Sequence, residues 1–289
     1  MKIERIAILG AGIMGHGIAQ VAAMSKFKVF LRDIDEAILK EALAKISGSL
    51  TRYVRKGSLT QKEVDEIMER ITPTTDLKKA VEEADYIIEA VPEILSLKRE
   101  LFSEIDRYAP SHCILSTNTS QYRITAIATA TKRRDKVIGT HFFNPPVMRH
   151  LVEIIKGLET SEETLAVTKD LCSRLEMEIV VCQKDSAGFI TTRLISLWLN
   201  EAQRIYEEGI ASKEDIDKAC RIAFGHPMGP FEIFDLSGLD TVLHIMSALA
   251  ENYGERFKPH QTLINLVESG YVGKKAGKGF YIYEHFSPQ

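Results

Sequence analysis

The chain is poor in cysteine and tryptophan and has no long uninterrupted apolar run. Its 289 residues include one tryptophan and four cysteines, Cys113, Cys172, Cys182 and Cys220. No two cysteines form a CxxC pair and none has histidine at zinc-ligand spacing, so we expect reduced thiols, no bound metal and a cytoplasmic location. The least polar stretch near the N-terminus, residues 6–24, is interrupted by glycines, His16 and Gln20. It predicts neither a signal peptide nor a membrane helix.

An excess of charge of one sign is also missing. The 37 basic residues nearly balance the 40 acidic residues, which gives a formal net charge of -3. This balance argues against a nucleic-acid-binding surface, so any anionic ligand must be held by a local arrangement of groups. With 45% hydrophobic and 27% charged residues, the composition is typical of a globular enzyme, and the length favours two domains.

Short apolar runs alternate with helix-period segments in the first part of the chain. Strands are predicted at 6–9, 29–31, 86–89, 113–116, 137–140, 152–155 and 178–181. Helices are predicted at 14–23, 35–56, 61–70 and 96–108, and after residue 184 at 188–208, 212–224, 238–253 and 261–269. This order predicts an α/β Rossmann-type doubly wound, mostly parallel sheet in residues 1–184 and an all-α domain in residues 185–289.

A glycine-rich motif follows the first predicted strand. Gly10 allows a tight turn, Gly12 lets the backbone approach a pyrophosphate, and Gly15 lets helix and strand pack closely. Ile13 and Met14 open the following helix, whose N-terminal N–H groups attract an anion. The motif therefore predicts a dinucleotide site, although glycines that serve only a turn would give the same pattern.

Asp33 follows the second predicted strand, where a carboxylate binds the adenosine ribose hydroxyls in dinucleotide-binding folds. This carboxylate would repel a 2'-phosphate, whereas the neighbouring Arg32 would attract one. We therefore favour NAD over NADP. In the alternative interpretation, Asp33 only caps a helix.

Two polar runs, 116–120 and 139–146, follow predicted strands at the end of the sheet where ligands of this fold gather. The second run contains His141, and histidine has a suitable pKa for accepting the proton of an alcohol near neutral pH. Glu153 is an isolated carboxylate in an otherwise apolar strand and needs a partner. His141 is the expected partner, oriented and made more basic by the carboxylate.

Taken together, the motifs make the sequence resemble the 3-hydroxyacyl-CoA dehydrogenase family, and within it the short bacterial 3-hydroxybutyryl-CoA dehydrogenases. The likeness extends over essentially the whole chain. It is carried by residues 10–20, 89–93, 118–120, 141–145, 151–153, 188–190, 226–230 and 273–281.

The resemblance implies a role for each matching residue. It implies that His141 is the catalytic base and Glu153 its partner, and that Ser120 binds the reacting oxygen and the acyl carbonyl. Glu93 and Lys98 match positions near the nicotinamide and its ribose.

Two further asparagines belong to the implied site, and two positions depart from the family. The resemblance implies that Asn118 contacts the cofactor and Asn144 the substrate. Thr192 stands where the family has a substrate-binding asparagine, and Ile94 replaces the asparagine that usually follows the glutamate. Threonine keeps a hydroxyl but loses the reach of an amide, so the family contact is expected from Thr192 itself or, alternatively, from a water or the neighbouring Thr191, in a subgroup with intact chemistry.

Four polar residues of the predicted helix 35–56 recur at helical spacing, namely Lys45, Ser49, Arg52 and Lys56. The pattern alone is equally consistent with a solvated helix face. In the family this helix lies over the coenzyme A tail. The resemblance therefore implies that Arg52 and Lys56 contact its phosphates.

The helical domain is richer in apolar residues than a small bundle needs. These include Trp198, Phe231, Phe234 and the segment 236–249. Apolar surface in excess of a core usually binds a partner. The family forms dimers through this domain, which also closes over the substrate, so a homodimer with an acyl-CoA substrate and neither nucleic-acid nor membrane partners is expected.

Three other functions remain open. A hydroxyacid dehydrogenase with a lysine proton relay needs a lysine early in the helix after the cofactor domain, and residues 188–200 contain none. A member of the same family acting on a free hydroxy acid or sugar acid would share all the motifs. A non-catalytic dinucleotide-binding protein would have no need for Ser120, His141 and Glu153 together.

Overall fold

The computed structural model describes residues 2–283 and divides into two compact units. The first unit ends at Ser186 and the second begins at Ala187. The sequence places the boundary after Lys184, within the same polar segment. Each unit is described by itself.

The first unit is built on an eight-stranded sheet with the order β3-β2-β1-β4-β5-β6-β7-β8. The strands are β1 Arg5–Leu9, β2 Lys28–Arg32, β3 Ile71–Thr74, β4 Tyr86–Glu89, β5 Ile114–Thr117, β6 Val137–Phe142, β7 Leu151–Lys156 and β8 Glu178–Cys182. Neighbouring strands are parallel except for the β6–β7 pair, which is antiparallel. The predicted Rossmann-type sheet is confirmed, and it brings the carboxyl ends of β1, β4, β5 and β6 to one edge.

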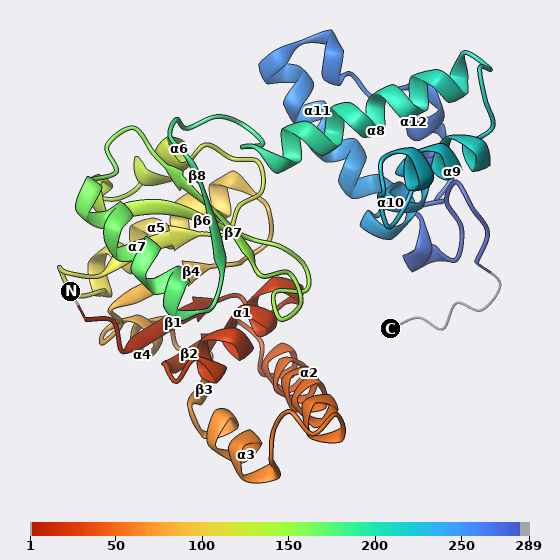
Figure 1. Ribbon diagram of the computed structural model, residues 1–289. Coiled ribbons are helices and arrows are strands. Elements are labelled where there is room, and N and C mark those ends of the chain that lie inside the picture. The colour runs from red at the N-terminus through yellow and green to blue at the C-terminus, as the bar shows by residue number, and fades with distance from the viewer. Residues whose placement is uncertain (1, 284–289) are drawn as a thin grey trace. The chain divides into compact units, whose positions relative to one another are not determined.

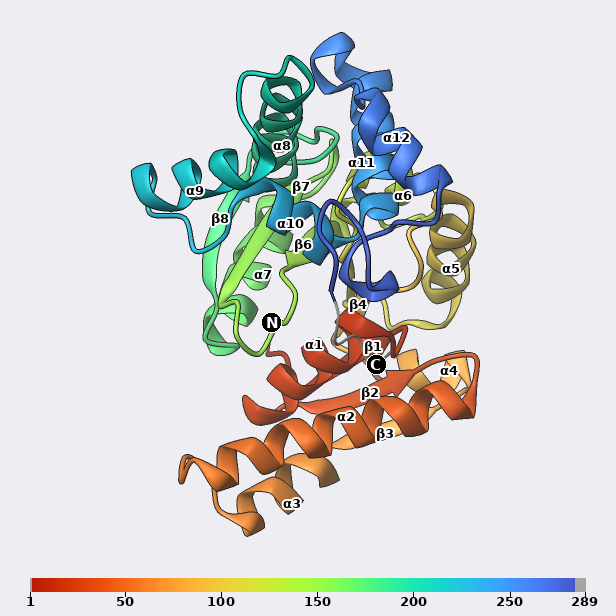
Figure 2. The ribbon, with the colours of Figure 1, turned by 90° about the vertical axis from the view of Figure 1, so that its right-hand side faces the viewer.

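Helices flank the sheet on both faces (Figure 1). They are α1 Ile13–Met24, α2 Glu36–Arg55, α3 Gln61–Glu69, α4 Leu77–Val81, α5 Leu95–Tyr108, α6 Ile124–Ala128 and α7 Glu162–Arg174, with a 3-10 turn at Arg134–Lys136. α2 and α3 form a pair that extends beyond the edge strand β3 (Figures 1 and 2). Their apolar faces are buried at Leu39, Ile46, Leu50, Val64 and Ile67, which join the core of the first unit.

Five elements were not predicted from the sequence, namely β3, α4, α6, α7 and α10 (Pro230–Ser237). β3 was not predicted, because Thr72, Pro73 and Thr74 interrupt its apolar pattern. It lies at the edge of the sheet, where proline is tolerated because one side of the strand needs no hydrogen bonds. α7 was also missed, although Ser161 caps it through the N–H of Thr164.

The central strands are apolar on both faces because helices cover both sides of a parallel sheet. In β4, Tyr86, Ile87 and Ile88 are fully buried. Glu89, the last residue of β4, is also fully buried, and it is the exception in an otherwise apolar strand.

The second unit is helical. It contains α8 Thr191–Glu207, α9 Lys213–Ala223, α10 Pro230–Ser237, α11 Leu239–Tyr253 and α12 Gln261–Glu268, with 3-10 turns at Glu255–Phe257 and Lys274–Ala276. Phe231 and Phe234 are fully buried in its core beside Phe280. The interpretation that these two phenylalanines are surplus apolar surface is therefore wrong, since the bundle itself covers them.

No single helix within residues 2–283 is long and apolar enough to cross a membrane. α10 and α11 reach that length only together, as a pair bent by 101°. Both helices contribute side chains to the core of the second unit.

Candidate active site

The glycine-rich turn between β1 and α1 has the form that a dinucleotide pyrophosphate requires. Gly10 has a φ of 100°, which favours glycine, and a side chain at Gly15 would lie 1.7 Å from the Gly10 carbonyl oxygen. A side chain at Gly12 would meet no atom within 4 Å, so space is open in front of the turn. α1 has neither a side-chain cap nor an acidic residue in its first turn. Its first N–H groups, from Ile13 and Met14, therefore suit an anion.

Asp33 lies beside this turn at the end of β2. Its Oδ2 accepts a hydrogen bond from the Ala11 N–H and its Oδ1 one from the Ile34 N–H, both at 2.7 Å. The cap of α2 is Asp35, which accepts from the Ala37 N–H. Asp33 therefore does not cap the helix, and its half-buried carboxylate is fixed next to the glycine turn.

His141 and Glu153 pair across two antiparallel strands. They are direct partners in the β6–β7 register, and His141 Nδ1 lies 2.7 Å from Glu153 Oε2. Glu153 is fully buried and His141 is 8% exposed. His141 lies inside β6, which extends two residues beyond the strand predicted at 137–140.

The pairing determines which imidazole nitrogen carries the proton. A carboxylate only accepts hydrogen bonds, so Nδ1 of neutral His141 donates to Glu153 and Nε2 bears the lone pair. The arrangement can therefore accept a proton at Nε2.

The end of β5 brings two more predicted residues to the same edge. Asn118 accepts a hydrogen bond on Oδ1 from the Phe142 N–H at 2.8 Å, which ties this segment to the strand that carries His141. The Ser120 N–H donates to Glu93 Oε1 at 3.0 Å, and the Thr119 hydroxyl donates to the same oxygen. Ser120 is half-buried.

Lys98 lies on α5 and is only 1% exposed. Its ammonium group contacts Glu89 Oε1 at 2.7 Å, Glu93 Oε2 at 3.0 Å and the Val91 carbonyl at 3.3 Å. All three acceptors bind the ammonium group. Of the two carboxylates, Glu93 is the more exposed, with 28% of its side chain accessible. Glu89 was not predicted as a site residue. A carboxylate at the end of an apolar run nevertheless needs a partner, as Glu153 does, because burying an unpaired charge is costly.

Other predicted residues lie further from this cluster. Asn144 is exposed and precedes Pro145 and the buried Pro146. On α2, Arg52 is exposed, as is Lys56 at its C-terminal end, but Ser49, about one turn before Arg52, is buried. The polar stripe on this helix is therefore not uniformly solvated.

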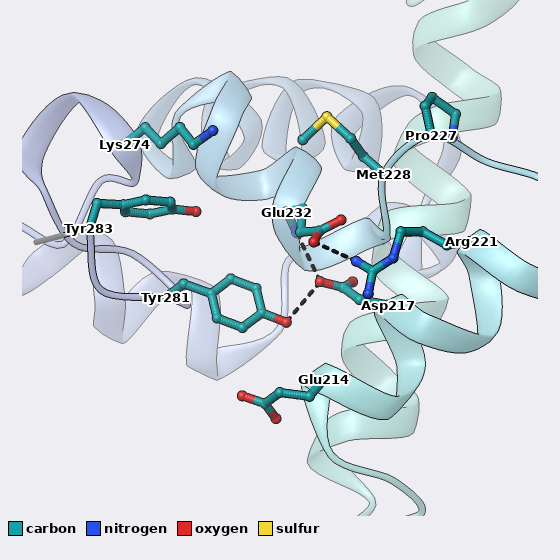
Figure 3. Close-up of a pocket in the computed structure, with 9 residues that line it drawn as sticks. All are labelled: Glu214, Asp217, Arg221, Pro227, Met228, Glu232, Lys274, Tyr281 and Tyr283. Atoms are coloured by element: carbon teal, nitrogen blue, oxygen red, sulfur yellow. Dashed lines mark hydrogen bonds and ion pairs between the residues drawn. The ribbon is translucent and has the colours of Figure 1, made fainter. Parts of the chain in front are cut away.

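Thr192 belongs to the second unit, in the first turn of α8, and is buried. That unit contains a pocket of about 450 Å³, lined by Glu214, Asp217, Arg221, Pro227, Met228, Glu232, Lys274, Tyr281 and Tyr283 (Figure 3). None of the site residues predicted from the sequence lines it.

The polar groups of this pocket largely satisfy one another. Tyr281 donates to Asp217 Oδ2 at 2.8 Å, and Arg221 pairs with Glu232 (Figure 3). Asp217 also accepts the Phe231 N–H at the start of α10. These contacts connect the C-terminal segment that carries Tyr281 to α9, and α9 to α10. Within residues 2–283, no three His, Cys, Asp or Glu side chains are arranged to hold a metal ion.

An open glycine turn and a buried histidine–glutamate pair at one edge of a doubly wound sheet define the class: a nicotinamide-dinucleotide-dependent dehydrogenase. Comparison with known families agrees. The NAD-binding-domain model of 3-hydroxyacyl-CoA dehydrogenase matches residues 5–186, and the C-terminal-domain model matches residues 188–283. The chain belongs to the 3-hydroxyacyl-CoA dehydrogenase family.

Individual relatives cover nearly the whole chain. The mitochondrial hydroxyacyl-coenzyme A dehydrogenase of Rattus norvegicus is 43% identical over 98% of this chain and 92% of its own length. The crystal structure of (S)-3-hydroxybutyryl-CoA dehydrogenase from Ralstonia eutropha has a TM-score of 0.94 and 35% identity, covering 98% of this chain and all of that one. A diketoreductase acting on dicarbonyl compounds has a TM-score of 0.85 and 31% identity, with coverage of 98% and 100%.

Proposed function

We propose that the protein interconverts (S)-3-hydroxyacyl-CoA and 3-ketoacyl-CoA with NAD, and that 3-hydroxybutyryl-CoA is its preferred substrate. The observation that carries this proposal is the 2.7 Å pair between His141 Nδ1 and Glu153 at the ligand-binding edge of the sheet. The geometry supplies one proton acceptor at the same edge of the sheet as the dinucleotide turn, which is what alcohol oxidation by hydride transfer requires.

The residues of this chain handle the proton. His141 Nε2 takes the proton of the 3-hydroxyl group, and Glu153 stabilises the imidazolium that forms. The bound nicotinamide supplies the acceptor for the hydride that leaves C3. The C3–O single bond becomes a carbonyl, and the proton on His141 is later released to solvent. In the reverse direction, ketone reduction, protonated His141 donates a proton from Nε2 to the carbonyl oxygen.

Three polar residues are proposed to orient the substrate. The Ser120 hydroxyl contacts the reacting oxygen and the acyl carbonyl, while the Ser120 N–H donates to Glu93 Oε1 at 3.0 Å. Asn144, exposed at the start of the loop after β6, contacts the acyl-CoA. Thr192 contributes a hydroxyl in place of the family asparagine.

The choice of NAD over NADP is supported by Asp33. Its carboxylate is fixed by two backbone N–H groups beside the glycine turn, so it would be close to a 2'-phosphate and repel it. Glu93, Lys98 and Asn118 are proposed to form the nicotinamide end of the cofactor site. Arg52 and Lys56, exposed at the end of α2, are proposed to bind the phosphates of coenzyme A.

We also propose a homodimer formed through the helical unit. Its largely exposed apolar side chains include Ile222 at 74%, Phe224 at 65% and Leu236 at 55%. Exposed apolar residues of this size favour a partner surface. Light scattering coupled to size-exclusion chromatography should give twice the chain mass, and a single-chain mass would contradict the proposal.

The test of function is a substrate panel followed by NADH absorbance. We expect rapid NADH oxidation with acetoacetyl-CoA, a weaker response with longer 3-ketoacyl-CoA substrates and little turnover with NADPH. The likeness to a diketoreductase favours one second candidate, a dehydrogenase for substrates without coenzyme A. A strong preference for free 3-keto acids over acetoacetyl-CoA would establish that alternative.

A further inference from the structure

A buried chain of charges joins the end of β4 to the loop that carries Ser120. It begins at Glu89, which is fully buried, continues through Lys98 on α5 and ends at the half-exposed Glu93. The two ion-pair distances are 2.7 Å and 3.0 Å. Glu93 then accepts the hydroxyl of Thr119 and the N–H of Ser120.

Every described partner of the Glu89 carboxylate is a donor. Oε1 accepts from Lys98 Nζ at 2.7 Å and from the Val91 N–H at 2.8 Å, and Oε2 accepts from the Thr117 hydroxyl at 2.6 Å. Thr117 in turn accepts the Thr119 N–H at 3.2 Å. Glu89 is therefore connected to the Thr119–Ser120 segment by two routes, one through Lys98 and Glu93 and one through Thr117.

Fold stability alone does not explain this arrangement. Burial raises the pKa of Glu89 above its ordinary value, and the Lys98 ammonium group and the two other donors offset this effect only in part. Burial also lowers the pKa of Lys98, but the two carboxylates more than offset this effect and keep the lysine charged. A buried ion pair is often no more stabilising than apolar residues of the same volume, and the rest of β4 is apolar.

The charges of the chain do not cancel. Two carboxylates surround one ammonium group, so the set carries one net negative charge when both carboxylates are ionised, and Glu93 is its most exposed member. Without Glu89, Lys98 would neutralise Glu93. The nicotinamide ring is positively charged when oxidised and neutral when reduced, so an uncompensated charge at Glu93 would favour the oxidised dinucleotide.

We propose that Glu89 is a positioning residue for the reaction: through Lys98 it fixes Glu93 and the Ser120 segment, and it leaves one negative charge at Glu93 that favours NAD+ over NADH. This inference rests on the proposed function, because it takes Glu93 to lie near the nicotinamide.

The test compares Glu89→Gln with Asp85→Asn. Each variant removes one carboxylate charge from a residue that accepts backbone N–H groups. Asp85 immediately precedes β4, and Glu89 is its last residue. The dissociation constants of NAD+ and NADH are measured by calorimetry for each purified protein. We expect Glu89→Gln to weaken NAD+ binding about tenfold, as for one charge acting over several ångströms, and NADH binding much less. Asp85→Asn should leave their ratio at the wild-type value.

A double variant separates charge from position and also covers the case in which Glu89→Gln folds poorly. Glu89→Gln with Lys98→Met again leaves one net negative charge at Glu93. We expect the double variant to restore the preference for NAD+. Its KM for acetoacetyl-CoA should be higher than that of the wild type, as in Glu89→Gln, because Glu93 and Ser120 are no longer held.

The outcomes are distinct. A wild-type chain that binds neither NAD+ nor NADH would overturn the proposed function and this inference with it. A wild-type chain that binds both, with the same NAD+ to NADH ratio in Glu89→Gln and in Asp85→Asn, would overturn only the role of Glu89.

Discussion

His141 and Glu153 are direct partners in the antiparallel register of β6 and β7, and their side chains meet at 2.7 Å. Because both residues lie within strands of one sheet, backbone hydrogen bonds fix their separation, and no loop rearrangement is needed to form the pair. The pair depends on the reversal of strand direction between β6 and β7, where an otherwise parallel sheet becomes antiparallel.

Glu153→Gln should impair turnover while leaving the fold intact. A glutamine amide can donate to Nδ1, which would move the ring proton to Nε2 and remove the base. We expect kcat to fall by about 10² to 10⁴, as for other histidine partners that set the tautomer. Steady-state rates with acetoacetyl-CoA and NADH measure this effect. An unchanged kcat in a properly folded variant would show that Glu153 does not control His141.

Gly17→Ala should disturb the segment after His141. A Cβ atom at Gly17 would lie 2.8 Å from Cδ of Pro146, closer than real contacts of this kind, so α1 and the 141–146 segment must separate. We expect a loss of about 1–3 kcal/mol in the free energy of unfolding and up to about a 10²-fold fall in kcat/KM. Denaturant unfolding and initial rates measure the two effects.

Gly48→Ala is the matched control, since a Cβ there meets no atom within 4 Å and Gly48 lies within α2. It should raise the free energy of unfolding by about 0.5–1 kcal/mol without changing kcat/KM. If Gly17→Ala behaves like Gly48→Ala, contact with Pro146 does not position the catalytic segment.

Asp33→Asn tests the cofactor preference. Asparagine retains an oxygen that can accept the Ala11 N–H, so the turn is preserved while the charge is removed. Hydrogen bonds to charged groups contribute about 1.5–3 kcal/mol, which predicts about a 10- to 100-fold increase in the KM for NAD. The KM for NADP should change much less or decrease. Equal increases for both cofactors would contradict the assignment of Asp33 to the ribose.

Asp85→Asn should remove part of the acid sensitivity of the first unit. Burial alone would raise the pKa of Asp85, but the N–H groups of Glu4 and Arg5 and the His112 ring bring it below the ordinary aspartate value. The stabilisation by Asp85 is therefore complete above pH about 4 and is lost as the pH falls through the lower folded-state pKa.

We expect Asp85→Asn to cost about 1–3 kcal/mol at neutral pH. As the pH falls below about 4, the free energy of unfolding of Asp85→Asn should decrease less steeply than that of the wild type. Urea unfolding at several pH values measures both quantities. Parallel pH profiles for the two proteins would show that the Asp85 carboxylate does not contribute to acid sensitivity.

The parts of the fold that follow from short sequence patterns were predicted. The glycine turn after β1 and the partnership of His141 with Glu153 each follow from a local pattern or from the need of a buried carboxylate for a partner. β3 was not predicted, because Pro73 is acceptable there only at the edge of a sheet, and edge position is a tertiary property.

The charge chain below Ser120 also depends on tertiary structure. Glu89 and Lys98 are nine residues apart, on a strand and on the following helix, and only the packing of α5 brings them together. The same holds for Tyr281 and Asp217, which are 64 residues apart in the sequence. In both cases the residue types are visible in the sequence, but their partners are not.

The central claim, that His141 is the base of a 3-hydroxyacyl-CoA dehydrogenase, is tested most directly by His141→Gln. The measurement is NADH oxidation with acetoacetyl-CoA at saturating concentrations, combined with the dissociation constant of NADH for the same protein. We predict that kcat falls by about 10² to 10⁴ while NADH binding stays close to the wild-type value. Turnover near the wild-type rate in a variant that binds NADH normally would contradict the account.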